Sequence, residues 1–164
     1  MNSALQILFH LDKFITNLLN IENISKKKFS NELLKIYNKI IEQDNYKYIS
    51  ISNFMNILIN KYNNFRVEQN DSVEFIRILL SEINNENSLI TKNFVYKEFE
   101  PLNKIISEIR EEYNNFFLTK ENSFIIQLFY IQLCNEFECK YGYKIYSVEK
   151  KLDISIYLQL IITK

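Results

Sequence analysis

Three side chains of this sequence could take part in hydrolysis by a thiol: Cys134, Cys139 and His10. A nucleophilic thiolate is usually stabilised by a helix N-terminus or by a neighbouring imidazole, both of which lower the thiol pKa. Both cysteines lie in a segment whose pattern predicts a β-hairpin, away from any predicted helix N-terminus. We therefore expect neither cysteine to act as a nucleophile.

A second group of polar side chains lies between residues 69 and 74. Asp71 and Glu74 have the spacing of a capping box, in which a short oxygen-bearing side chain at the N-cap is followed three residues later by a carboxylate. A helix is therefore predicted to begin at Asp71 and to end in the polar stretch 84–88. Its predicted buried stripe consists of Phe75, Ile78, Leu79 and Ile83.

The elements that precede this box are also predicted to be helical. Apolar residues at three- and four-residue spacing predict one amphipathic helix over residues 3–19. Ser25 is a candidate N-cap for a second helix, and Ser52 is a candidate N-cap for a third, shorter one. The apolar face of the first helix comprises Leu5, Leu8, Phe9, Leu11, Ile15, Leu18 and Leu19.

After the box, the pattern changes from helix to strand. Residues 93–99 are predicted to be extended, Pro101 suits the first turn of a helix that continues to Phe117, and Ser123 begins a short helix through Phe129. A hairpin follows, with strands over 130–137 and 145–148 and a turn at 140–143, and residues 152–162 alternate as a further strand. Helices followed by antiparallel strands predict an α+β fold.

The composition favours one intracellular domain, or part of a larger one. The 164 residues are 47% apolar and contain a single Gly and a single Pro, which favours long helices. The 20 Lys and Arg residues balance the 20 Asp and Glu residues, so we expect neither nucleic acid nor a membrane as a partner. Two cysteines are few for a disulfide scaffold, and no signal peptide is evident, so we expect a cytoplasmic or nuclear protein.

Three segments, in order, resemble the ubiquitin-specific cysteine proteases. Residues 1–8 resemble the second half of the family's box Asn-x-x-x-x-Cys-Tyr-Met-Asn-Ser-x-Leu-Gln-x-Leu. Residues 69–75 and 79–80 resemble its Gln-Gln-Asp-Ala-x-Glu-Phe and Leu-Leu, with Asn70 in place of the second Gln. In residues 123–158 the matching residues are Leu128, Phe129, Cys139, Gly142, Tyr143, Ser147, Glu149 and the run Leu152 to Ile156.

The resemblance implies a papain-like thumb–palm–finger fold. Residues 1–129 would form most of the helical thumb, and residues 130–164 would form the first strands of the fingers and palm. The implied activity is hydrolysis of the bond after the C-terminal glycine of ubiquitin, so the expected partner is ubiquitin or a ubiquitinated protein. No cofactor is expected, and the resemblance implies no oligomeric state.

In this alignment the family's catalytic residues fall outside the 164 residues. The nucleophilic Cys would precede Met1 by two residues, the oxyanion-binding Asn would lie further upstream, and the His with its Asp or Asn partner would follow Lys164. We therefore expect an incomplete domain without catalytic residues. Because the family's His comes late in the chain, we expect His10 to have an ordinary packing or helix-face role.

The resemblance also names candidate binding residues. The box 69–74 would border the cleft for the ubiquitin tail, which ends Arg-Leu-Arg-Gly-Gly. Gln69, Asn70, Asp71 and Glu74 are the candidates: Asp71 would meet an Arg or the tail backbone, and Gln69 would pair with tail amides. The alternative is that Asp71 and Glu74 only cap their helix, and the two roles are compatible. Asn2 and Gln6 would lie near the active-site wall or be solvated helix positions.

Many members of the family bind structural zinc through two Cys-x-x-Cys pairs. Cys139-Lys140-Tyr141-Gly142 keeps only the first cysteine of one pair, so we expect no metal site and two free thiols that are buried or half-buried.

Three interpretations of the whole chain follow. It is part of an active deubiquitinase, a catalytically inactive relative that binds ubiquitin or another protein, or an unrelated helical interaction module.

Overall fold

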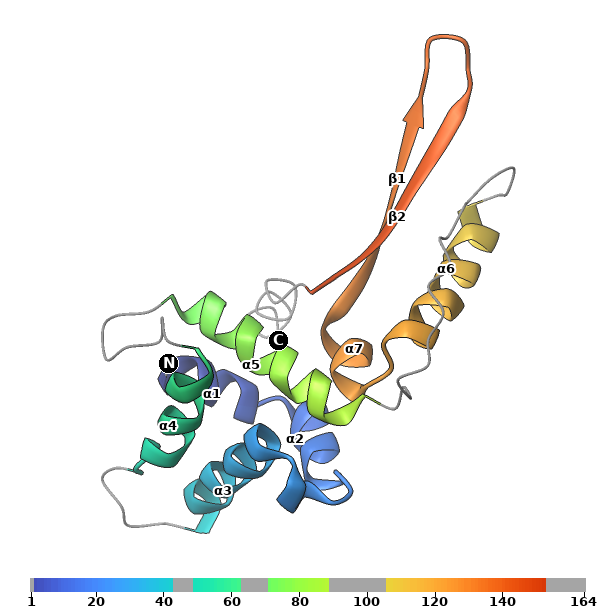
Figure 1. Ribbon diagram of the computed structural model, residues 1–164. Helices are drawn as coiled ribbons and strands as arrows, with labels where there is room; N and C mark the ends of the chain where they lie inside the picture. The colour runs from blue at the N-terminus through green and yellow to red at the C-terminus, as the bar shows by residue number, and fades with distance from the viewer. Residues whose placement is uncertain (1, 43–48, 63–70, 89–105, 153–164) are drawn as a thin grey trace. The chain divides into compact units, whose positions relative to one another are not determined.

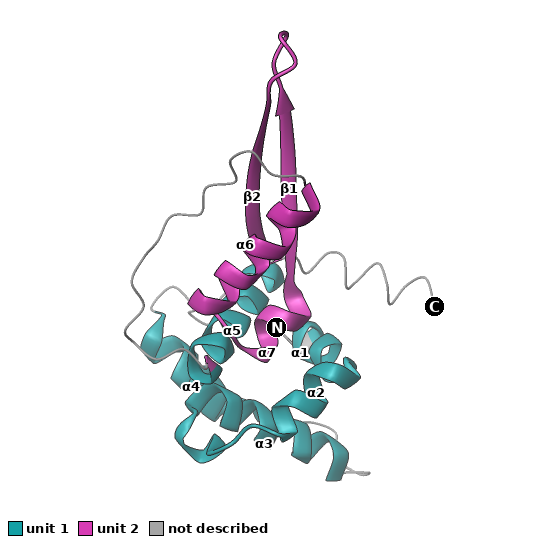
Figure 2. Cartoon of the chain, turned by 90° about the vertical axis from the view of Figure 1, so that its right-hand side faces the viewer, with its two compact units in different colours: residues 1–87 teal, residues 88–164 magenta. Residues whose placement is uncertain are grey.

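The computed structural model of the chain describes residues 2–42, 49–62, 71–88 and 106–152 (Figure 1). The chain divides into two compact units, residues 1–87 and residues 88–164 (Figure 2). Within the described ranges, the first unit contains only helices, and the second contains helices followed by a hairpin. This order confirms the predicted α+β class. No helix in these ranges is long and apolar enough to cross a membrane.

The described part of the first unit contains five α-helices and one 3-10 turn. They are α1 (Asn2–Phe9), α2 (Asp12–Leu19), η1 (Ile24–Lys26), α3 (Lys28–Glu42), α4 (Ser52–Lys61) and α5 (Ser72–Asn87). Helix α3 contacts α2, α4 and α5, and α5 also contacts α1. The ring of Phe54 on α4 lies 6.4 Å from Phe29 on α3 and 6.2 Å from Phe75 on α5, both edge to face. These three buried rings join α3, α4 and α5 in one core.

The single helix predicted over residues 3–19 is wrong, because the chain breaks between Phe9 and Asp12. The end of α1 tightens: the amide of Leu11 donates to the carbonyl of Leu8 at 3.1 Å, and Leu11 itself is extended. The break lets α1 and α2 bury separate faces. Phe14 is therefore completely buried, whereas Leu19, expected in the stripe, is 52% exposed.

Both predicted serine caps in this unit are also wrong. Ser25 lies within η1, and α3 begins later, at Lys28. Ser52 is the first residue of α4, and the N-cap residue Ile51 provides no side-chain cap. The hydroxyl of Ser50 accepts a weak hydrogen bond from the Ser52 amide at 3.4 Å.

Helix α5 begins as predicted, and it ends within the polar stretch 84–88, also as predicted. The carboxylate of Asp71 accepts a hydrogen bond from the Val73 amide at 2.8 Å, as an N-cap should. Phe75, Leu79 and Ile83 are buried, and Ile78 is half-buried. Most of this polar stretch forms the last turn of the helix, which ends at Asn87.

The second unit contains α6 (Ile106–Lys120), α7 (Phe124–Phe129), β1 (Tyr130–Glu138) and β2 (Lys144–Leu152). The short helix predicted to begin at Ser123 is confirmed, and Ser123 is its N-cap: the hydroxyl accepts from the amides of Ile125 and Ile126 at 3.2 and 3.4 Å. The predicted hairpin is confirmed, with β1 and β2 antiparallel from the pair Tyr130–Leu152 to the pair Glu138–Lys144. The extended segment predicted at 93–99, the helix start at Pro101 and the strand beyond Leu152 lie outside the described residues.

Helix α6 packs on one face of the hairpin. The ammonium of Lys150 donates to the side-chain oxygen of Asn114 at 2.7 Å and lies 4.8 Å from the centroid of the Phe117 ring. The amide of Gln132 donates to the carbonyl of Arg110 at 3.1 Å. Lys150 and Gln132 are cross-strand partners, so α6 is held to both strands through residues of one face.

Candidate functional site

The predicted site residues that the structure describes lie on α1 and α5. Asp71 and Glu74 are both exposed, at the N-cap and in the first turn of α5. Asn2 is the first residue of α1, and Gln6 is exposed on the same helix. Gln69 and Asn70 lie outside the described residues.

Asp71 keeps binding capacity beyond its capping role. One carboxylate oxygen accepts from the Val73 amide at 2.8 Å, and within the described part of the chain the other oxygen has no hydrogen-bond partner. Glu74 places a second exposed carboxylate in the same turn. The partial positive charge of a helix N-terminus is complementary to the negative charge of both side chains. Together they offer acceptors to a guanidinium group or to backbone N–H groups.

Helices α1 and α5 are in contact, but the described side chain of Gln6 is not joined to those of Asp71 and Glu74. No hydrogen bond or ion pair between described residues links Gln6 to Asp71 or Glu74. The carbonyl of Gln6 accepts instead from Nδ1 of His10 at 2.7 Å. Because a carbonyl oxygen only accepts, Nδ1 is the donor in this contact, and the His10 ring has a local partner in the preceding helix α1.

The two thiols lie in the hairpin. Cys134 is half-buried within β1, as expected, whereas Cys139 is exposed, which corrects the expectation that both would be buried or half-buried. Cys139 adjoins the tight turn, where its carbonyl accepts from the Gly142 amide, and a turn residue has little packing to cover it. Both thiols are free, and neither lies at a helix N-terminus. Among the described residues, no cluster of His, Cys, Asp or Glu side chains could hold a metal ion.

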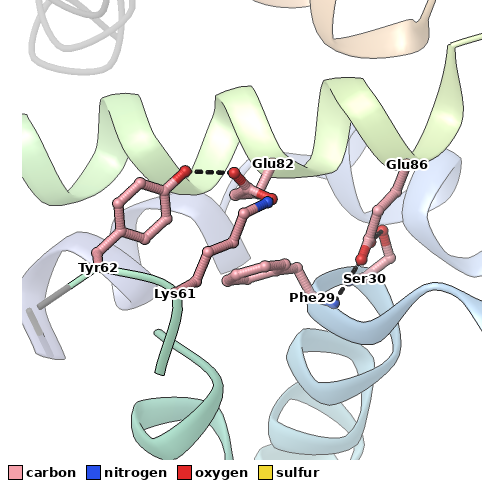
Figure 3. A network of polar contacts seen from close by, with 6 residues as sticks. All are labelled: Phe29, Ser30, Lys61, Tyr62, Glu82 and Glu86. Atoms are coloured by element: carbon pink, nitrogen blue, oxygen red, sulfur yellow. Dashed lines mark hydrogen bonds and ion pairs between the residues drawn. The ribbon is translucent and has the colours of Figure 1, made fainter. Parts of the chain in front are cut away.

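A buried carboxylate that the sequence analysis missed lies on the inner face of α5 (Figure 3). Glu82 is only 4% exposed, and its two oxygens accept from the ammonium of Lys61 and from the hydroxyl of Tyr62. Burial, together with the hydrogen bond to Glu82 and its charge, raises the pKa of Tyr62 to about 12. The phenol therefore stays protonated, and remains a donor to Glu82, at neutral pH.

One turn further along α5, a second carboxylate caps the start of α3. Glu86 accepts from the amides of Phe29 and Ser30 at 2.8 and 2.9 Å and from the Ser30 hydroxyl at 2.8 Å. These amides belong to the first turn of α3, whose N–H groups have no partner within the helix. The available signal was the spacing Phe75, Leu79, Glu82, Glu86, which places both carboxylates on the buried stripe.

A groove of about 550 Å³ adjoins these carboxylates. Its carboxylates are already engaged, Glu82 by Lys61 and Tyr62 and Glu86 by the start of α3, so neither offers a free general base to a ligand. The groove is lined by Lys28, Phe29, Ile57, Asn60, Lys61, Glu82, Asn85 and Glu86.

The family model of ubiquitin carboxyl-terminal hydrolases matches residues 1–156. The chain belongs to the ubiquitin carboxyl-terminal hydrolase family. The match spans both compact units and confirms the family inferred from the three sequence segments. A comparison with curated proteins found no match.

Membership of the ubiquitin carboxyl-terminal hydrolase family gives this chain a domain of deubiquitinase type, with ubiquitin or ubiquitinated proteins as the substrate class. It also excludes the interpretation as an unrelated interaction module. In this ubiquitin carboxyl-terminal hydrolase domain, the polar side chains of α5 are of two kinds. Exposed acceptors lie at the start of α5, and a buried network fixes the ends of α3 and α4.

Proposed function

We propose that residues 1–164 provide the part of a deubiquitinase domain that binds the C-terminal tail of ubiquitin, with Asp71 and Glu74 as tail acceptors. The observation that carries this proposal is the state of Asp71: exposed, tied at one oxygen to the Val73 amide, and unpaired at the other among the described residues. A carboxylate held in this way has lost side-chain freedom before it meets a ligand, so binding costs less conformational entropy. Its negative charge complements the two arginines of the tail.

We further propose that this polypeptide, by itself, binds ubiquitin without hydrolysing it. A hydrolytic thiol needs an activating helix terminus or imidazole. Cys134 lies within a strand and Cys139 beside a turn, and the Nδ1 proton of His10 is bound to the carbonyl of Gln6. The second interpretation, an inactive ubiquitin-binding protein, is therefore the one we favour for residues 1–164.

The binding proposal is tested by titrating the isotopically labelled chain with ubiquitin and following amide shifts. Asp71→Asn is the decisive variant, because Asn caps a helix about as well as Asp and only the charge is lost. We expect about five- to tenfold weaker binding at nearly unchanged stability, as expected for loss of one charge-assisted hydrogen bond. Asp71→Arg should abolish the shifts.

The matched control is Asp12→Asn, which removes the same charge from the exposed first turn of α2. It should leave ubiquitin affinity unchanged. Ubiquitin lacking its C-terminal tail should cause none of the shifts near Asp71. Shifts that are the same in Asp71→Arg as in the original chain would rule out the tail site.

The absence of hydrolysis is tested with ubiquitin that carries a thiol-reactive group at its C-terminus. We expect no covalent adduct after incubation with the chain. An adduct mapped by peptide mass spectrometry to Cys134 or Cys139 would contradict the proposal.

A further inference from the structure

A half-buried lysine in the second unit has no acidic partner. The ammonium of Lys150 on β2 donates to the side-chain oxygen of Asn114 at 2.7 Å and lies 4.8 Å from the centroid of the Phe117 ring. Among the described residues, Lys150 forms no ion pair with a carboxylate. Burial lowers the pKa of Lys150, because the ammonium has lost part of its water without gaining an opposite charge.

The titratable groups around Lys150 do not supply that opposite charge. Glu149 and Lys151 flank it on β2, and both are exposed on the other face of the strand. Tyr113 on α6 and Tyr130 at the start of β1 lie on the same side as Lys150. Burial raises the pKa of both phenols, so they are neutral at pH 7. A carboxylate from outside would therefore be the first negative charge to meet this ammonium.

Lys150 lines a groove along the seam between α6 and the hairpin (Figure 1). The groove consists of two hollows of about 330 and 400 Å³, which share Asn114 and Gln132 and therefore adjoin. The lining positions on α6 recur every three or four residues from Ser107 to Leu118, so they form one face of the helix, roughly 16 Å long. An extended peptide rises about 3.3 Å per residue, so about five residues fit along this face.

The polar groups of this groove suit a peptide main chain, which brings both donors and acceptors. The Asn114 oxygen is engaged by Lys150, and the Gln132 nitrogen is engaged by the carbonyl of Arg110. Their other amide atoms, the nitrogen of Asn114 and the oxygen of Gln132, have no hydrogen-bond partner among the described residues. The exposed side chain of Gln127 adds a further donor and acceptor.

The two ends of the groove differ in character. Near Lys150 the half-buried Leu118 and the buried Ile126 give an apolar wall. At the other end Arg110 and Glu111 carry opposite charges, which largely cancel. The net positive charge of the groove therefore comes from Lys150, beside an apolar surface.

We propose that the groove between α6 and the β1–β2 hairpin binds an extended acidic segment of a partner protein, with a carboxylate at Lys150 and an apolar side chain against Leu118. A carboxylate is the complementary partner for an ammonium that is already partly desolvated. The segment is not the tail of ubiquitin, whose two arginines would meet Lys150 with a like charge. The site thus goes beyond the proposed tail-binding role of α5 and uses residues of the second unit only.

The test titrates the isotopically labelled 164-residue chain with the capped peptide acetyl-Ala-Leu-Glu-Leu-Ala-amide. Its leucines flank the glutamate, so that either chain direction brings an apolar side chain to Leu118. We expect shifts of the side-chain amide signals of Asn114 and Gln132. The same peptide with Gln in place of Glu should bind about fivefold or more weakly, as expected for loss of one charge-assisted hydrogen bond.

Lys150→Met is the decisive variant, because it keeps an unbranched apolar stem and removes the charge. It should bind the Glu peptide about fivefold or more weakly and no longer distinguish it from the Gln peptide. The matched control is Lys151→Met, the same change at the neighbouring exposed position on the other face of β2, and it should keep the preference for Glu.

A second measurement needs no variant. The pKa of Lys150, followed through its side-chain carbon signals in the original chain, should rise with saturating Glu peptide, because a nearby carboxylate favours the ammonium form. It should not rise with the Gln peptide. An unchanged pKa of Lys150 with bound Glu peptide would overturn the assignment of the carboxylate to this lysine.

Three other results would overturn the site. They are absence of binding, equal affinity of the original chain for the Glu and Gln peptides, and equal loss of affinity in Lys150→Met and Lys151→Met. Sodium acetate is the remaining probe, and it should bind far more weakly than the Glu peptide. Acetate binding as tight as that of the peptide would indicate a site for small anions and would overturn the proposal of a protein segment.

Discussion

Removing the carboxylate of Glu86 should be among the costlier single changes in the first unit. The carboxylate accepts three hydrogen bonds, from the amides of Phe29 and Ser30 and from the Ser30 hydroxyl. Each hydrogen bond to a charged group is worth about 1.5–3 kcal/mol, and loss of an N-cap costs about 0.5–2 kcal/mol. These contributions overlap, and Asn87 still donates to the Ser30 hydroxyl at 3.1 Å. We therefore expect Glu86→Ala to lower the free energy of unfolding by about 2–4 kcal/mol.

Urea unfolding, followed by far-ultraviolet circular dichroism, measures this loss. With a slope of about 2 kcal/mol per molar urea, the midpoint should fall by about 1–2 M. Glu86→Gln retains one acceptor oxygen and should cost about half as much. The control is Glu32→Gln on α3, whose carboxylate pairs with the half-exposed Lys35 and should cost less than about 0.5 kcal/mol. Equal midpoints for Glu86→Ala and Glu32→Gln would refute the assignment of Glu86 as the cap of α3.

Three further outcomes follow from single contacts. The pKa of Tyr62 is raised to about 12 in the folded chain, so the protonated phenol stabilises the folded state. This stabilisation should be lost as pH rises from about 10 to about 12. The difference in the free energy of unfolding between the original chain and Tyr62→Phe, measured by urea unfolding, should shrink over that pH range. A difference that stays constant with pH would contradict the raised pKa of Tyr62. Ser123→Ala should cost about 1 kcal/mol or more in the same assay, because the N-cap of α7 is lost; an unchanged urea midpoint would count against this role. Gly142→Ala should weaken the hairpin by about 1–2 kcal/mol, because Gly142 has a φ of 80° and open space around it; cross-strand nuclear Overhauser effects as strong as in the original chain would count against this strain.

The parts of the fold that depend on local pattern were predictable from the sequence. Alternation and turn residues gave the β1–β2 hairpin, and the oxygen-bearing side chains of Asp71 and Ser123 gave the starts of α5 and α7. In each case the residues that determine the structure lie within a few positions of one another, so periodicity and capping rules apply directly.

The parts that depend on distant residues were not predictable. The start of α3 is set by Glu86, more than fifty positions away, and no nearby serine supplies the cap. The break between α1 and α2 contains neither Gly nor Pro, so local propensity gave no warning of it. Tertiary packing decided both boundaries, which is the usual limit of reasoning from propensity.

For the candidate site, the sequence predicted the acceptors and missed the buried carboxylate of Glu82 on the same helix. Asp71 and Glu74 follow from the capping pattern and the family resemblance, and their role in binding ubiquitin stays a prediction. The burial of Glu82 was missed because a charged residue among the apolar positions of an amphipathic helix is not expected to be buried unless its partners are known. Lys61 and Tyr62 lie some twenty positions earlier in the chain.

Burial along the β1–β2 hairpin is uneven, and its stability should be uneven in the same way. Residues Tyr130 to Cys134 of β1 are half-buried, whereas the four residues that follow are exposed. The distal pair Phe137–Ile145 leaves 58% and 69% of its side chains exposed. Breaking ladder hydrogen bonds near Gly142 therefore uncovers little apolar surface, and breaking them near Tyr130 uncovers much more. The hairpin should unzip from its turn in small steps, so its distal half can change shape against a partner while its base stays closed on α6.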